Sequence, residues 1–99
     1  MSGYGEFYEA DARLVILKEL AKQTDGRLNE AILTRVLDTF GFHRSREWVR
    51  TQLRKLEDVR AITLMEAGTV LVAMITRAGV DHVERRSVLE GVARPSPEV

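Results

Sequence analysis

Hydrophobic positions along the chain recur mostly with a helical period. Spacings of three and four residues predict helices over residues 6–23, 30–40 and 46–58, and a further helix over residues 77–90. The predicted core stripe of the first helix consists of Phe7, Ala10, Leu14, Leu17, Leu20 and Ala21. A residue with an oxygen-bearing side chain precedes each of the other three helices, and these are candidate N-caps: Asn29, Ser45 and Thr76.

Between the third and fourth helices the pattern changes to that of strands. Residues 61–65 and 69–76 are rich in β-branched side chains and predict a β-hairpin with its turn near Ala67-Gly68. Residues 27–28 suffice for one short strand pairing only. A short turn containing Gly41 joins the second and third helices, which is the signature of a helix-turn-helix. The hairpin that follows makes it winged.

The predicted fold class is therefore α+β, mostly helical: a winged helix-turn-helix with a three-helix core, a β-hairpin wing and a C-terminal helix. A chain of 99 residues fits one domain, which we place at residues 1–92. Residues 93–99 contain both prolines and few apolar side chains, and we expect them to form a disordered tail.

Composition excludes several classes of function. The chain has no cysteine, which rules out disulfides, thiolate zinc sites and cysteine nucleophiles. No apolar run is long enough to span a membrane, and the N-terminus lacks the features of a signal peptide, so we expect a cytoplasmic protein of a bacterial host cell. Neither a nucleophile motif nor a glycine-rich phosphate loop is present. We therefore expect a binding protein that is not an enzyme and takes no cofactor.

Several stretches resemble known regulators. The step "ITRAG" at residues 75–79 is similar to the passage from wing to last helix in MarR-like and ArsR-like proteins. The stretches "DARLVIL", "RSREWVRTQLRKLE" and "RAGVDHVERR" resemble small winged-helix proteins encoded in Mu-like prophages. The resemblance covers residues 6–90 and implies a winged-helix fold that serves either in DNA binding or in protein docking. Unlike ArsR-type metal sensors, the chain has no cysteine pair on its third helix.

Charge is concentrated around the third helix, although the whole chain balances 15 Lys and Arg against 15 Asp and Glu. Residues 43–60 contain six bases and three acids, which is the polarity that local phosphate binding needs. The candidate readers of base edges are Arg46, Glu47 and Arg50, early in the helix, with Thr51 on the same outward face. The candidate phosphate contacts are Arg44, Ser45, Arg54 and Lys55.

Two functions remain open from the sequence. The first is sequence-specific binding of double-stranded DNA by a phage or prophage transcriptional regulator, with the third helix in the major groove. The alternative is a protein–protein adaptor in a phage or replication assembly, which the acidic wing tip around Glu66 favours. Arginines standing free on the third helix would support DNA binding, whereas arginines neutralised by carboxylates would support the adaptor.

The composition of the hairpin indicates whether the protein forms a homodimer. Residues 70–75 are apolar on both faces of the predicted strand, which indicates a covering helix or a homodimer.

We expect Trp48 to pack in the core, and we expect one of Tyr4, Phe7 and Tyr8 to pack as well. His82 is expected on a solvated helical surface. No metal site is predicted, because His43 and His82 are too far apart in sequence for a zinc motif.

Overall fold

A computed structural model of the chain describes residues 3–96, with side chains from Gly5 onward. It is an α+β structure with more helix than strand. The elements in chain order are α1 (Gly3–Lys22), β1 (Arg27–Asn29), α2 (Glu30–Thr39), α3 (Arg46–Asp58), β2 (Ile62–Ala67), β3 (Val70–Ile75) and α4 (Arg77–Val83). This order is the one that the hydrophobic pattern predicts.

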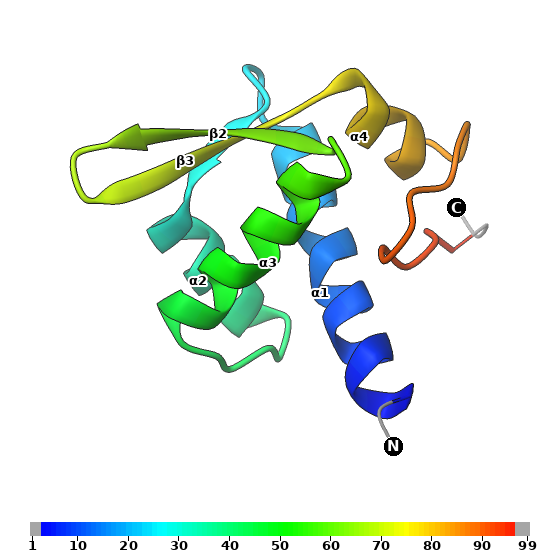
Figure 1. Cartoon of the computed structure of the whole chain (residues 1–99), viewed down its shortest axis with the longest axis horizontal. Coiled ribbons are helices and arrows are strands. Elements are labelled where there is room, and N and C mark those ends of the chain that lie inside the picture. Colours follow the sequence, from blue (N-terminus) through cyan, green and yellow to red (C-terminus); the bar gives the residue numbers. More distant parts are fainter. Residues whose placement is uncertain (1–2, 97–99) are drawn as a thin grey trace.

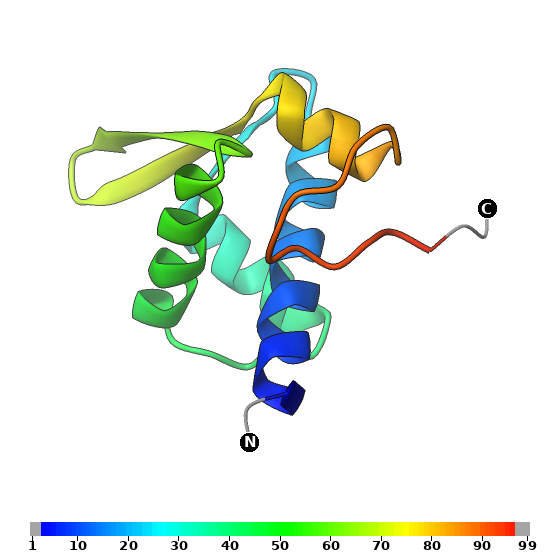
Figure 2. The ribbon, with the colours of Figure 1, turned by 45° about the vertical axis from the view of Figure 1, so that its right-hand side comes forward.

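The three strands form one antiparallel sheet in the order β1-β3-β2. β2 and β3 are joined by a two-residue turn, Gly68-Thr69, and pair from Ile62↔Ile75 to Ala67↔Val70. Gly68 has a φ of +64°, a left-handed conformation that suits glycine in a tight hairpin turn. The far end of the hairpin projects past α2 and α3, as Figures 1 and 2 show. The predicted hairpin and the short first strand are thus both confirmed.

The core lies between α1, α2, α3 and one face of the sheet. Its fully buried members come from all of these elements, and they include Ile16, Leu20, Leu33, Leu37, Leu53, Leu56, Ile62 and Ala73. The predicted stripe of α1 is only partly correct: Phe7 is 71% exposed and Ala21 is exposed, whereas Ala12 and Ile16 are buried. α1 contacts α2, α3, α4 and β3, so its buried surface is broader than one helical stripe.

Local capping explains where the helices begin and end. The side chains of Asn29, Ser45 and Thr76 accept hydrogen bonds from the backbone N–H three residues further on, so all three predicted N-caps are confirmed. α3 ends in a Schellman motif, in which the Ala61 N–H donates to the Leu56 carbonyl and Arg60 adopts a φ of +65°.

The last helix is shorter than the pattern predicts. α4 ends at Val83 because Arg85 has a φ of +66° and the Arg86 N–H donates to the Asp81 carbonyl, a second Schellman motif. The predicted extension to residue 90 is therefore wrong. The chain then turns back along α1, where the Ala93 N–H donates to the Ala10 carbonyl and Val92 is buried (Figure 2). The boundary at residue 92 stays a prediction, and residues 97–99 lie outside the described residues.

His82 is fully buried, so the expected solvated position is wrong. Its Nδ1 accepts from the Leu89 N–H at 2.9 Å and its Nε2 lies 2.8 Å from the Ala93 carbonyl oxygen. The prediction fails for a physical reason: the segment after α4 folds back over the helix and covers the His82 side chain, which an isolated helix would expose.

Candidate nucleic-acid interface

α3 has a clearly divided surface. Its buried residues are Val49, Gln52, Leu53 and Leu56. With about 100° of rotation per residue, the positions opposite these four are Glu47, Thr51, Arg54 and Asp58, and all of them are exposed. The apolar stripe predicted for this helix is therefore confirmed. Of the predicted outward positions, Arg46, Glu47, Thr51 and Arg54 are exposed, and Arg50 is half-buried.

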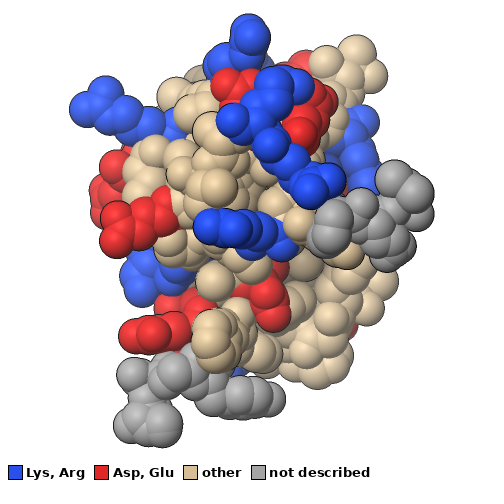
Figure 3. Space-filling view, turned by 90° about the vertical axis from the view of Figure 1, so that its right-hand side faces the viewer, with Lys and Arg blue, Asp and Glu red and all other residues tan. Residues whose placement is uncertain are grey.

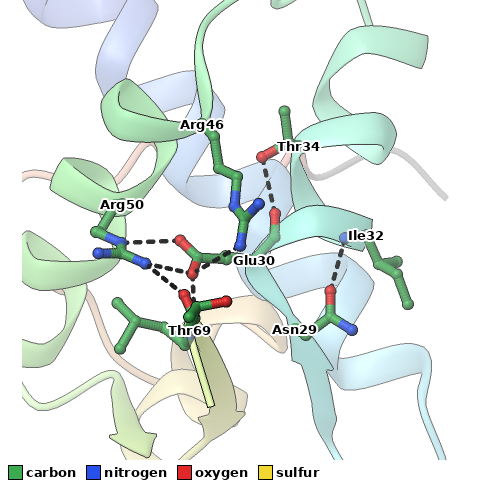
Figure 4. Close-up of polar contacts among 8 residues, drawn as sticks. Asn29, Glu30, Ile32, Thr34, Arg46, Arg50 and Thr69 are labelled. Carbon is green, nitrogen blue, oxygen red and sulfur yellow. Dashed lines mark hydrogen bonds and ion pairs between the residues drawn. The ribbon is translucent and has the colours of Figure 1, made fainter. Parts of the chain in front are cut away.

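Two of the outward arginines are held by a buried carboxylate. Glu30, the first residue of α2, is fully buried, and Figure 4 shows its side chain between α3 and the hairpin. Arg50 donates to it through Nε at 2.9 Å and through a terminal nitrogen at 2.6 Å. The Leu71 N–H on β3 donates to the same carboxylate at 2.7 Å, and Arg46 reaches it at 3.5 Å. One side chain thus links α2, α3 and β3.

The four contacts to Glu30 are unequal. The Arg50 and Leu71 bonds to Oε2 are short and occupy the two lone pairs of that oxygen, so Arg46 is left with a long third contact. The hydrogen bond from Arg50 is the main cause that lowers the pKa of Glu30 from 4.5 to about 2, against the opposing effect of burial. Glu30 is therefore charged at neutral pH. Two guanidinium groups share one carboxylate, and one positive charge is left over.

Arg50 also contacts the hairpin directly. The terminal nitrogen that binds Glu30 donates a second bond, at 3.2 Å, to the Thr69 carbonyl at the hairpin turn. The fork of donors that would engage a guanine is thus occupied within the protein. The hydrogen bond to Glu30 raises the pKa of Arg50 above its already high ordinary value. Arg50 is a firm connection between α3 and the hairpin.

Arg44 lies on the other side of α3, against α1. Its guanidinium stacks over the rings of Tyr8 and Trp48, at 4.9 and 5.2 Å from their centroids. Tyr8 also contacts Phe42, with ring centroids 5.0 Å apart. The expected packing of Trp48 is confirmed, since it packs against the core while staying partly exposed. Of the three N-terminal aromatics, Tyr8 packs and Phe7 is exposed, while the Tyr4 side chain lies outside the described ones.

The remaining cations of α3 have partly exposed partners. Lys55 lies 3.4 Å from Glu9 of α1, and Arg54 lies 3.9 Å from Glu57 on its own helix. Ion pairs of this kind contribute little to stability and exchange readily with other ions. The structure therefore brings Arg46, Glu47, Arg50, Thr51 and Arg54 to one surface beside the hairpin. Arg44 and Lys55 lie toward α1, and Ser45 serves as the N-cap between the two groups.

Sequence patterns missed two buried polar residues of this region. Glu30 looks like an ordinary acid in the first turn of a helix, and nothing local shows that β3 and α3 close over it. Gln52 is 1% exposed and accepts from Arg13 Nε at 2.8 Å. A signal for Glu30 was nevertheless present, since Arg46 and Arg50 lie one helical turn apart and need a counter-charge if they are to pack against the fold.

Comparison with known proteins assigns the chain to a family. No protein-family model matches it. It is 37% identical over 87 residues to uncharacterised protein gp26 of Escherichia phage Mu, covering 88% of this chain and 90% of the phage protein. The chain belongs to the gp26 family. The expected resemblance to proteins of Mu-like phages is confirmed at this level. No solved structure matches the chain.

On the face that carries α4, basic and acidic side chains are interspersed (Figure 3). Arg86, for example, contacts both Asp81 and Glu84. Among residues 3–96, no cluster of three or more His, Cys, Asp or Glu side chains is placed to hold a metal ion. No helix in the same range is long and apolar enough to cross a bilayer.

Proposed function

We propose that this protein is a winged helix-turn-helix that binds double-stranded DNA in a sequence-specific manner and acts as a phage or prophage transcriptional regulator. In this proposal α3 enters the major groove and the β2–β3 hairpin is the wing, as in MarR-like and ArsR-like proteins. The observation that carries the proposal is the exposed face of α3, which presents arginine, threonine and glutamate side chains beside a projecting hairpin.

Ion pairing on α3 is compatible with this function. The side chains of Arg46 and Arg54 are 45% and 51% exposed, and Lys55 is 50% exposed. Within the described part of the chain, Glu30 is the one buried carboxylate that pairs with a cation of α3, and it balances one charge of the Arg46–Arg50 pair. The partners of Arg54 and Lys55 are surface carboxylates, which a DNA phosphate would displace at little cost.

The protein–protein adaptor is a second candidate, and a specific observation favours it. Arg46, Arg50, Arg54 and Lys55 each have a carboxylate within 4.0 Å, and this matches the arrangement expected of an adaptor. The exposed Glu66 near the hairpin turn adds negative charge where many wings carry a base. An adaptor would retain the fold and its buried Glu30 while showing no affinity for duplex.

We further propose that the protein forms a homodimer in solution. Leu71 and Ala73 of β3 point into the core, which accounts for one apolar face of this strand. The opposite face carries Val70, Val72 and Met74 beside the 52% exposed Met65 of β2. A two-fold arrangement would give a regulator two matching half-sites.

Light scattering coupled to size-exclusion chromatography, with and without a random-sequence duplex, tests these proposals together. We expect the mass of a dimer, and a complex that forms at low salt and dissociates as the salt concentration rises. Titrations by fluorescence anisotropy at two salt concentrations then measure the number of phosphate contacts. Failure to bind duplex at low salt would exclude the DNA-binding function and leave the adaptor.

A further inference from the structure

The exposed surface of α3 has a centre and two flanks. Glu47, Thr51 and Arg54 form the centre, together with Asp58 at the last turn of the helix, because they lie opposite the buried residues of the helix. One flank faces α2 and the hairpin and carries Arg46 and Arg50, which both contact Glu30. The other flank faces α1 and carries Lys55, which contacts Glu9, together with Trp48.

A helix lying in the major groove presents these three regions to different parts of the duplex. The centre of its exposed face meets the base edges on the groove floor, and its flanks meet the two sugar–phosphate backbones. Building on the proposed DNA-binding function, we propose that Glu47, Thr51 and Arg54 determine its base specificity. Arg46 contacts a phosphate, and Arg50 is a positioning residue that fixes α3 against the hairpin.

The chemistry of the central residues suits base recognition. Arg54 can donate two bonds to guanine O6 and N7, and its contact with Glu57 is long, at 3.9 Å. Glu47 can accept from the N4 amino group of cytosine. Thr51 offers a hydroxyl group, and its methyl group can contact the methyl of thymine. Its hydroxyl donates to the Glu47 carbonyl at 3.2 Å, which leaves the oxygen able to accept.

The arginines of the hairpin-side flank suit other roles. Arg50 uses Nε and one terminal nitrogen on Glu30 and Thr69, so its two-donor edge is occupied. Arg46 has one contact, at 3.5 Å, and borders a recess of about 210 Å³ together with Glu47, Arg50 and Thr69. This arrangement changes the sequence-based assignment, which took Arg46 and Arg50 as readers and Arg54 as a phosphate contact. Residue spacing alone does not reveal the carboxylate that turns Arg46 and Arg50 sideways.

The test is selection from a pool of randomised duplexes, followed by affinity measurements on the enriched sequence and on a scrambled one. Three variants probe the centre: Glu47→Gln, Thr51→Val and Arg54→Gln. Each should change the enriched sequence at one or two positions. Each should also lose roughly 5- to 150-fold in affinity for the wild-type sequence, with a much smaller loss on the scrambled duplex.

Arg46→Gln probes the flank, and Arg77→Gln is the matched control, since it removes the same charge from a side chain on α4 that is 84% exposed. Arg46→Gln should lower affinity for both duplexes equally and reduce the salt slope by about one, with the enriched sequence unchanged. Arg77→Gln should match the wild type. All of these positions are exposed, and thermal melting verifies that each variant is folded.

The outcomes separate this inference from the proposed function. If the wild-type protein binds no duplex from the pool at low salt, DNA binding is excluded altogether. A wild-type protein that binds duplex but enriches no sequence overturns the inference while general DNA binding stands. The inference is also overturned if Arg46→Gln changes the enriched sequence and the three central variants do not.

Discussion

Glu30 has a charge in a place where an unpaired charge would be very costly. Burial of a carboxylate is tolerated when hydrogen bonds and opposite charges surround it, and here Arg50 and the Leu71 N–H supply three short bonds. The loss of either the Arg50 or the Leu71 hydrogen bonds would leave the buried Glu30 carboxylate with unsatisfied oxygen atoms. For residues 3–96, every buried side-chain nitrogen and oxygen has a hydrogen-bond partner. Glu30 therefore makes the position of α3 depend on that of the hairpin.

This residue gives stability a specific dependence on pH. The pKa of Glu30 is about 2 in the folded protein, below its ordinary value of 4.5, so the unfolded chain takes up the proton first as pH falls. The stabilisation is fully present above pH 4.5 and is lost as pH decreases toward 2. Urea unfolding between pH 2 and pH 6 should show this decline in the wild type and a flatter curve in Glu30→Gln.

Glu66→Gln is the control for that measurement. It removes one carboxylate from the exposed part of the hairpin and leaves the Glu30 contacts intact. Its curve should fall as steeply as that of the wild type. If Glu30→Gln and the wild type lose stability in parallel over this range, the buried ion pair does not contribute to acid unfolding.

At the scale of elements, α4 packs closely against the junction of α3 and the sheet. Gly79 lies in α4, and a Cβ atom there would be 2.5 Å from the Ala61 carbonyl oxygen and 2.7 Å from Cγ1 of Ile75. The Thr76 N–H also donates to the Ala61 carbonyl, which holds the start of the helix in place. Glycine at this position therefore allows a close approach of two backbones.

Gly79→Ala should consequently destabilise the protein, although alanine favours helices. The clash with backbone must be relieved by a shift of α4, which we expect to cost about 1–3 kcal/mol of unfolding free energy. Gly5→Ala in α1 is the matched control, because no heavy atom lies within 4 Å of its added Cβ. It should be neutral or stabilising by up to about 1 kcal/mol. Chemical denaturation of both variants gives the comparison, and equal effects would refute the close approach.

The elements also show which features can be predicted from the sequence. The N-caps, the hairpin turn and the buried stripe of α3 depend on residues close together in the chain, and all are confirmed. The buried side of α1, the end of α4 and the burial of His82 depend on segments that are distant in sequence. Glu30 belongs to the same group, because its partners lie 20 and 41 residues away. The candidate site stays a prediction, and the contacts that Arg46 and Arg50 make with Glu30 were not foreseen, because they depend on the distant β3 and α2.

At the scale of the whole molecule, the segment after α4 completes the fold on the side away from the hairpin. Residues 88–93 return to α1, where Arg13 donates to the Gly91 carbonyl and the Ala93 N–H donates to Ala10. His82 is the centre of this arrangement. A backbone N–H can only donate, so the Nδ1 atom of His82, which faces the Leu89 N–H, carries no proton. A carbonyl can only accept, so the Nε2 atom of His82, which faces the Ala93 carbonyl, carries the proton.

His82→Ala should therefore loosen the C-terminal segment and destabilise the whole domain. The change leaves the Leu89 N–H and the Ala93 carbonyl without their partner and opens a cavity beside α1, which we expect to cost roughly 2–5 kcal/mol. Arg77→Ala, on the exposed side of the same helix, should stay within about 0.5 kcal/mol of the wild type. Hydrogen exchange gives the local evidence, because the Leu89 and Ala93 amides should lose protection in His82→Ala before the core amides do. If those two amides exchange at wild-type rates in the variant, the imidazole does not hold the segment in place.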